Sequence, residues 1–402
     1  MKIGIIREGK VPHDKRVPLT PQQCLQLQRD FPQCSLCIEP SPYRCYSNEE
    51  YEALGLTLSE DLSDCDLIIG IKEVPKSQLI PQKKYVFFSH TIKRQKHNRE
   101  MLIDILQKNI ELIDYERLTD ENQHRIIGFG RHAGIVGTYN GILGYGKKYD
   151  LFDLKRAHLC HDYTELEEEM KKVRLSNIKI LLTGDGRVAN GAIETLGRLK
   201  IRKVTPFEFL NYSFREPVYA QLHSKDYHEA IDGSIWNTAD FYANPQHYRS
   251  TFLPYTAVCD LLLHCSFWDS RAPALFTKAD MRSPEFRISV IADISCDVNG
   301  AIPSTLRSSS IEEPFYGYNP STELTDLPFN SNTITIMAVD NLPCELPRDA
   351  SEDFGKNLLE RVFPALLNEN NNKMIARATI AKNGQLMPPY AYLSDFVSDI
   401  QQ

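Results

Sequence analysis

Short apolar runs alternate with amphipathic segments through the first third of the chain. Five of these runs predict β-strands, at residues 3–6, 35–39, 67–71, 85–89 and 111–113. Helices are predicted between them, one starting at Thr20-Pro21, where proline suits the first turn, and two more at 48–54 and 93–107. Strands that alternate with helices indicate a doubly wound α/β sheet whose strands are parallel.

The rest of the chain repeats this alternation with one interruption. Thr164 and Glu167 have the spacing of a capping box and predict a charged helix that ends near Ser176. Further strands are predicted at 178–182, 260–265, 287–294 and 333–339, and a last helix at about 350–367. Residues 211–251 are rich in Tyr, His and Asn without clear periodicity, so no elements are assigned to them.

One apolar segment, residues 128–146, is unusually rich in glycine. Its glycines include Gly130, Gly134, Gly137, Gly141 and Gly144. Glycine costs a helix interior about 0.8–1.0 kcal/mol relative to alanine. A helix that tolerates this cost must pack very closely on a neighbour, and we expect it to link two domains. The alternative is an irregular glycine loop.

A glycine turn of the form G-x-G-x-x-A follows the strand at 178–182. Gly184 allows the tight turn, Gly186 removes the Cβ that would block a phosphate, and Ala189 lets the next helix pack close to its strand. The free N–H groups of that helix would point at a dinucleotide pyrophosphate, with Asp185, Arg187 and Val188 beside it. An ordinary strand–helix corner is the alternative.

Ionisable residues follow four strands of the first sheet in succession. These are Arg7-Glu8 with Lys15-Arg16, then Lys72-Glu73, His90, and Asp114-Tyr115-Glu116. Each group alone would fit a solvated loop, but parallel strands deliver their carboxyl ends to one edge of the sheet. A lysine partly desolvated among arginines loses proton affinity, and a histidine beside it titrates near neutral pH. The four groups together therefore predict a cleft with acid–base chemistry.

These patterns predict two Rossmann-like doubly wound α/β domains with a cleft between them. Residues 1–135 and 345–402 are expected to form the substrate and catalytic domain. Residues 136–344 are expected to form the dinucleotide-binding domain.

Charge and composition narrow the class of protein. The net charge of the 402 residues is −7, which argues against a nucleic-acid surface. Neither a signal-peptide core nor a transmembrane stretch is found, so a soluble cytoplasmic protein without membrane contact is expected. The ten cysteines follow no secreted framework, and Cys34 and Cys37 have no second pair, so no metal site is expected.

Several motifs also carry a family resemblance. The segments Ile6-Arg7-Glu8 and Arg16-Val17-Pro18-Leu19-Thr20-Pro21 resemble the opening of the alanine dehydrogenase and saccharopine dehydrogenase superfamily. Residues 69–75 and 87–91 look like its catalytic-lysine and catalytic-histidine segments. Residues 85–93, 112–117, 128–144, 254–268, 291–297 and 338–350 are similar to the lysine–2-oxoglutarate reductase domain of aminoadipic semialdehyde synthases. The likeness covers nearly the whole chain.

The resemblance implies a reaction and roles for individual residues. The reaction is the interconversion of saccharopine with L-lysine and 2-oxoglutarate, using NAD or NADP. Lys72 and His90 would perform acid–base catalysis, and Glu8 and Glu116 would tune their charge. Arg16 would bind a substrate carboxylate. Asp297 would lie near the nicotinamide, and Arg131, a departure from the related reductase, would bind a second carboxylate or alter the substrate.

Cofactor choice and function class stay open at this point. An NAD site normally has an acidic residue about 20 residues beyond the first glycine, but Thr205 stands there, after Arg202 and Lys203. NADP is therefore favoured over NAD, although Glu208 lies close enough to hold a ribose. Another opine or amino-acid dehydrogenase, or a non-catalytic nicotinamide-binding regulator, is the alternative. The physiological direction and the oligomeric state are not predicted.

Overall fold

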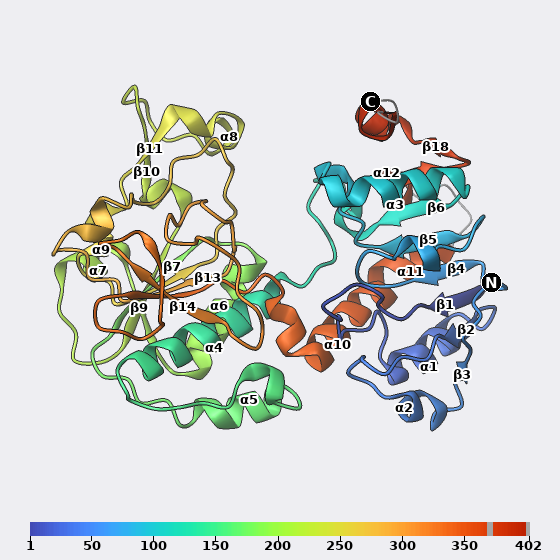
Figure 1. Cartoon of the computed structure of the whole chain (residues 1–402), viewed down its shortest axis with the longest axis horizontal. Helices are drawn as coiled ribbons and strands as arrows, with labels where there is room; N and C mark the ends of the chain where they lie inside the picture. The colour runs from blue at the N-terminus through green and yellow to red at the C-terminus, as the bar shows by residue number, and fades with distance from the viewer. Residues whose placement is uncertain (368–372, 399–402) are drawn as a thin grey trace. The chain divides into compact units, whose positions relative to one another are not determined.

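The computed structural model describes residues 1–367 and 373–398 (Figure 1). The chain divides into two compact units, one made of 1–129 and 347–402 and the other of 130–346. The expected domain boundaries were 135 and 345. The first boundary differs because the glycine-rich helix belongs wholly to the second unit and does not link the two.

The first unit is built on an eight-stranded sheet in the order β18-β17-β6-β5-β4-β1-β2-β3. Strands β1 to β6 are parallel and run in the Rossmann order 3-2-1-4-5-6. Two antiparallel strands extend the β6 edge. The bounds are β1 (Lys2–Ile5), β2 (Ser35–Ile38), β3 (Thr57–Leu58), β4 (Leu67–Ile69), β5 (Lys84–Phe87), β6 (Glu111–Asp114), β17 (Thr379–Lys382) and β18 (Gln385–Leu386).

Both faces of this sheet are buried, which explains why its strands read as continuous apolar runs. Ile69 and Val86 enter one hydrophobic cluster, whereas Ile68, Tyr85 and Phe87 enter the other. Helix α1 begins where expected, with Thr20 as its N-cap. The helices are α1 (Pro21–Asp30), α2 (Asn48–Glu52), α3 (Lys96–Gln107), α10 (Pro347–Asn357), α11 (Phe363–Leu367), α12 (Lys373–Ala378) and α13 (Ser394–Ser398), with a π-helical turn (Leu358–Val362) joining α10 to α11.

The second unit has its own eight-stranded sheet, in the order β15-β14-β16-β13-β12-β7-β9-β8. The six strands from β8 to β16 in this order are parallel, and β14 and β15 are antiparallel. The bounds are β7 (Lys179–Thr183), β8 (Arg202–Val204), β9 (Val218–Leu222), β12 (Leu261–His264), β13 (Val290–Asp293), β14 (Phe315–Asn319), β15 (Leu324–Asp326) and β16 (Ile334–Met337). Two doubly wound α/β sheets, as predicted, are therefore present.

The glycine-rich segment is a helix, α4 (Gly130–Lys148), packed on α6 (Arg187–Arg198). A Cβ on Gly134 would lie 1.9 Å from the Val188 carbonyl oxygen, and a Cβ on Gly191 would lie 1.9 Å from that of Arg131. The two backbones therefore approach so closely that only glycine fits at these positions. The prediction of a closely packed helix is confirmed, and the alternative of a loop is wrong.

Three expectations about this unit need correction. Helix α5 (Tyr163–Met170) is capped by Asp162, whose carboxylate accepts the Glu165 N–H, so Thr164 is not its N-cap. The helix begins at Tyr163, so Asp162 occupies the N-cap position and its carboxylate reaches the N–H of the third helical residue. Residues 211–251, left without elements, contain β9, α8 (Thr238–Ala243) and the hairpin of β10 (His228–Ala230) and β11 (Tyr248–Ser250), followed by α9 (Leu253–Thr256).

The strand that follows β7 along the chain is not its neighbour in the sheet. β9 pairs with β7, and β8 lies outside it at the sheet edge.

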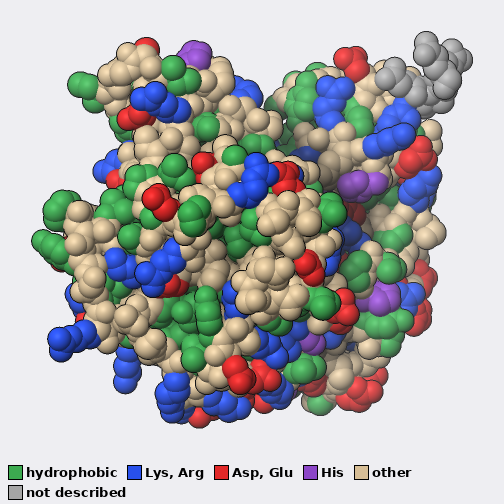
Figure 2. All heavy atoms as spheres, turned by 60° about the vertical axis from the view of Figure 1, so that its left-hand side comes forward, with side chains coloured by type: hydrophobic (Ala, Val, Ile, Leu, Met, Phe, Trp, Pro, Cys, Tyr) green, Lys and Arg blue, Asp and Glu red, His purple; other side chains and the backbone are tan. Residues whose placement is uncertain are grey.

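On the face shown in Figure 2, basic and acidic side chains are interspersed. No helix in the described part of the chain is both long and apolar enough to cross a bilayer.

Candidate functional site

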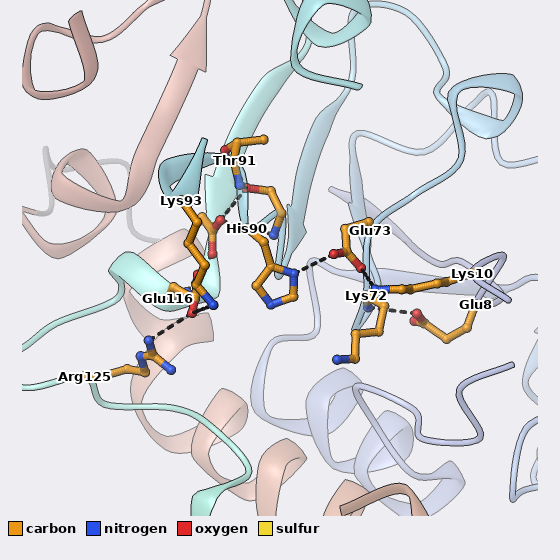
Figure 3. Close-up of polar contacts among 11 residues, drawn as sticks. Glu8, Lys10, Lys72, Glu73, His90, Thr91, Lys93, Glu116 and Arg125 are labelled. Atoms are coloured by element: carbon orange, nitrogen blue, oxygen red, sulfur yellow. Dashed lines mark hydrogen bonds and ion pairs between the residues drawn. The ribbon is translucent and has the colours of Figure 1, made fainter. Parts of the chain in front are cut away.

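The carboxyl ends of β1 and β4 meet where the strand order of the first sheet reverses. This switch point is where doubly wound sheets bind ligands. Glu8 follows β1, and Lys72 and Glu73 follow β4, while His90 follows β5 (Figure 3). The structure therefore gathers at one sheet edge the ionisable groups that the sequence distributes over four strands.

Glu8 holds the loop after β4 in place. Its carboxylate accepts the backbone N–H groups of Ile71 at 2.6 Å and Lys72 at 2.8 Å. Burial, reinforced by the nearby charge of Asp14, raises the pKa of Glu8 to about 8, although the two N–H groups oppose the rise. Glu8 therefore carries a proton through much of the neutral range and adds little negative charge beside Lys72.

Lys72 lies close to a buried ion pair between Asp14 and Arg16, both 2% exposed. Arg16 Nε donates to Asp14 at 2.9 Å, and its guanidinium lies 4.0 Å from the centroid of the Phe129 ring. Burial lowers the pKa of Lys72, and the positive charge of Arg16 lowers it further. Burial alone would raise the pKa of Asp14, but the Arg16 charge holds it well below its usual range. Lys72 thus releases its proton more readily than an exposed lysine does.

His90 is oriented by a carboxylate from the neighbouring strand end. Its Nδ1 lies 2.6 Å from Glu73, whose other oxygen accepts from Lys10 Nζ at 2.9 Å. Burial alone would raise the pKa of Glu73, but the contacts with His90 and Lys10 bring it down to about 2. Figure 3 shows the imidazole turned toward Glu73 and the Lys72 amine extending away from it. Glu73 is therefore an ionised group that fixes the His90 ring and leaves its Nε2 for chemistry.

Glu116 belongs to a second charged group on the other side of His90 in Figure 3. Its Oε1 lies 3.1 Å from Arg125 Nη2 and 3.4 Å from Lys93 Nζ. The side chain is 6% exposed, and its backbone N–H donates to Asp114 at 2.7 Å. Asp114 also accepts the Ser89 N–H at 3.1 Å, so it ties the ends of β5 and β6 together.

The second unit has a cavity of about 550 Å³ at the carboxyl ends of β7, β12 and β13. Its lining includes Gly184, Asp185, Gly186, Arg187, Val188 and Asp297. These are six of the seven residues that the sequence predicts for cofactor binding. The hairpin region adds Tyr227, Phe241 and Tyr242.

The glycine turn has the geometry that a pyrophosphate needs. Gly184 has φ +96°, which favours glycine, and a Cβ there would lie 3.1 Å from the Cys265 carbonyl oxygen. Gly186 is the N-cap of α6, and its missing Cβ would meet open space. Open space at the positive end of a helix leaves room for a phosphate to approach the backbone. These residues fit a dinucleotide.

Two predicted site residues lie elsewhere. Thr205 follows the edge strand β8 and caps α7 (Pro206–Asn211), with its N–H and hydroxyl both donating to Glu208 at 2.8 Å. β9 occupies the place next to β7, and β8 lies outside it, so cofactor binding by Thr205 stays a prediction. Arg131 makes a bidentate pair with Glu194 of α6, at 2.9 and 2.8 Å. Its role as a carboxylate ligand stays a prediction.

Two residues of the first site, Asp14 and Lys10, were not among the predicted ones. Asp14 binds Arg16, and Lys10 binds Glu73. Glu73 was named with Lys72 at the end of its strand, but its contact with His90 was not predicted. Cys34 and Cys37 are free thiols, and no cluster of metal-ligand residues occurs in the ranges that the structure describes.

Comparisons with known proteins find several that this chain is similar to. Residues 4–136 match the family described as alanine dehydrogenase/PNT, N-terminal domain. The chain is 29% identical to alpha-aminoadipic semialdehyde synthase of Arabidopsis thaliana over 439 aligned positions, which cover 97% of this chain and 41% of that protein. It is also 29% identical to the mitochondrial enzyme of that name from Mus musculus, covering 97% and 47%. The chain thus spans less than half of these relatives.

A fungal relative matches along nearly its full length. Saccharopine dehydrogenase [NAD(+), L-lysine-forming] of Schizosaccharomyces pombe is 25% identical, with 93% of this chain and 95% of that protein covered. Among solved structures, L-alanine dehydrogenase aligns with a TM-score of 0.64 at 15% identity, covering 99% of this chain and all of the other. Transhydrogenase from Sinorhizobium meliloti gives 0.59 at 14% identity, covering 97% and 99%. These matches confirm the Rossmann-like fold and the resemblance to the alanine dehydrogenase and saccharopine dehydrogenase superfamily.

Proposed function

We propose that this chain is a nicotinamide-dependent oxidoreductase that interconverts saccharopine with L-lysine and 2-oxoglutarate. The observation that carries the proposal is the cluster of Lys72, Glu8 and His90 at the switch point of the first sheet. A buried lysine with a lowered pKa, beside a histidine held by a carboxylate, is suited to moving protons near neutral pH. Relatives named for this chemistry match the chain over more than nine-tenths of its length.

The proposed reaction begins with formation of a C–N bond. The ε-amine of the lysine substrate loses a proton and attacks the carbonyl carbon of 2-oxoglutarate, and the carbonyl oxygen gains a proton. Protonation of that hydroxyl then expels water and leaves a C=N bond. Lys72 is the group we assign to these proton transfers, with His90 as its partner. A reduced nicotinamide, when bound, supplies the hydride that saturates the C=N bond.

The neighbouring charges support this assignment. Protonated Glu8 does not stabilise the lysine ammonium as an ionised carboxylate would, so it leaves the Lys72 pKa low. Glu116, between two cations, adds one buried carboxylate on the His90 side. Arg16 is the residue we assign to a substrate carboxylate, and the bond to Asp14 fixes the position of its guanidinium. Residues 184–188 and Asp297 would hold the cofactor in the second unit.

Oxidation of NADPH and NADH with lysine and 2-oxoglutarate, each substrate omitted in turn, tests the proposal. We expect oxidation only when both substrates are present. Oxidation with ammonia and pyruvate instead would point to an alanine dehydrogenase type of reaction. Cofactor binding without turnover on any amino acid and oxoacid pair would point to a regulator.

A further inference from the structure

The order of strands in the second sheet changes which loop lies beside the cofactor's adenosine ribose. In doubly wound sheets the ribose 2′ position is held at the end of the strand next to the glycine-turn strand. Here that strand is β9, paired with β7 from Lys179↔Val218 to Thr183↔Leu222. The residues that follow it are His223, Ser224 and Lys225.

These residues line a small cavity that adjoins the glycine turn. The cavity has a volume of about 240 Å³, and its walls include Asp185, His223, Ser224, Lys225, Trp236 and Tyr242. Asp185 and Tyr242 also line the larger cofactor cavity. The aromatic walls come from the hairpin region that the sequence left without elements. The small cavity therefore adjoins the proposed cofactor site, and the residues that follow β9 give it polar walls.

The two acidic residues of this loop region are already engaged. Asp226 accepts the backbone N–H of His223 at 2.8 Å, which closes the 3₁₀ turn η5 (Ser224–Asp226). Asp185 lies 3.2 Å from Nδ1 of His223, so this carboxylate already has a hydrogen-bonding partner in the loop. A ribose 2′-hydroxyl is normally held by an acidic side chain at this strand end, whereas a 2′-phosphate is met by cations and hydroxyls.

We propose that the loop after β9 selects NADP(H), with Lys225 and Ser224 binding the 2′-phosphate and His223 shielding it from Asp185. Lys225 is exposed at the edge of the cavity, so its ammonium can reach an anion that enters there. This inference rests on the proposed nicotinamide-dependent function and names the residues that set its cofactor preference.

Isothermal titration calorimetry with adenosine 2′,5′-bisphosphate and with 5′-AMP tests the inference without any turnover. We expect the intact protein to bind the bisphosphate about tenfold or more tightly than 5′-AMP, as loss of one charged hydrogen bond implies. Lys225→Ala should remove most of that difference and leave 5′-AMP binding unchanged. Ser224→Ala should reduce it by a smaller factor. The matched control is Arg202→Ala, which removes an exposed cation from β8, where Arg202 pairs with Glu216.

Two results would overturn this inference and leave the proposed function standing. One is equal affinity of the intact protein for both nucleotides. The other is loss of the preference in Arg202→Ala while Lys225→Ala retains it, because the edge strand β8 would then carry the selectivity. A protein that binds neither nucleotide would instead contradict the dinucleotide site itself, and with it the proposed function.

Discussion

Replacement of Glu8 by glutamine should change how the stability of the protein depends on pH. Glu8 has a pKa of about 8 in the folded protein against an ordinary value of 4.5. The folded state therefore binds more protons than the unfolded state between these pH values. Its stability should fall as pH rises through this window, by up to about 1.4 kcal/mol per pH unit. Glutamine cannot ionise, so Glu8→Gln removes this contribution.

The size of the effect follows from the two pKa values. Between pH 5 and pH 8 the folded-state proton on Glu8 accounts for about 3 kcal/mol of the free energy of unfolding. This is an upper figure, because the residue is only half-buried. The N–H groups of Ile71 and Lys72 donate to the two oxygens of the Glu8 carboxylate, and glutamine keeps only one oxygen that can accept them. That loss lowers stability at every pH and leaves the pH slope unaffected.

Urea denaturation at several pH values from 5 to 8 measures this slope in both proteins. We expect the free energy of unfolding of Glu8→Gln, minus that of the intact protein, to rise by about 2–3 kcal/mol across the range. Glu60→Gln is the matched control, since it removes an exposed carboxylate that pairs with Arg7. A difference for Glu8→Gln that stays constant with pH would refute the account of Glu8 as a protonated group.

Three further substitutions test other parts of the structure. Lys72→Met should lower kcat by about 10²–10⁴-fold without changing the Kd of the cofactor, and turnover at the intact rate would remove Lys72 from the mechanism. Gly134→Ala places a Cβ 1.9 Å from a carbonyl oxygen of α6 and should lower the free energy of unfolding by about 2 kcal/mol or more. Gly197→Ala adds a Cβ where no atom outside its own helix lies within 4 Å and should raise the free energy of unfolding by about 0.5–1 kcal/mol. Equal effects of the two substitutions in urea denaturation would contradict the close packing of α4 on α6. His90→Gln removes a contact that holds the pKa of Glu73 at about 2. The free energy of unfolding should therefore fall less between pH 4.5 and pH 2 in this variant than in the intact protein. The same fall in both proteins, measured by urea denaturation, would argue against the contact between His90 and Glu73.

Much of the fold could be predicted because both sheets are buried on two faces. The strands at 67–71 and 85–89 read as apolar runs. β4 lies within the first range and β5 overlaps the second, with ends that differ by at most two residues. The helix predicted at 350–367 is present as α10, the π-helical turn and α11, starting three residues earlier. It is not the last helix, because α12 and α13 follow it.

Elements that depend on distant partners were not predictable in the same way. β17 is a short strand that pairs with β6, more than 250 residues away, and β18 pairs in turn with β17. β9 is fully buried, but its neighbours in sequence are aromatic and polar, which hid its apolar run. The order of β8 and β9 is set by packing at the sheet edge, which one sequence does not report. The sequence therefore did not reveal that β9 lies next to β7 and that β8 lies at the sheet edge.

In the candidate site, too, some residues could be predicted from the local sequence and others could not. Glu8, Lys72 and His90 were identified because each directly follows a predicted strand, and parallel strands bring these ends together. Asp14 and Lys10 lie in an irregular loop and look like solvated charges in the sequence. Asp14 pairs with Arg16 only two residues along the chain, but the sequence does not show that this pair is buried. Lys10 reaches Glu73 only through a tertiary contact between residues far apart in the chain.

The most direct test of the proposed reaction follows the nitrogen atom. Lysine that carries heavy nitrogen at its ε position would be incubated with 2-oxoglutarate, NADPH and the protein, and the products identified by mass spectrometry. The account predicts saccharopine that retains the heavy nitrogen between the two carbon skeletons and requires Lys72 for its rapid formation. Reduction of 2-oxoglutarate to an amino acid that lacks the label, or no labelled product together with normal NADPH binding, would contradict it.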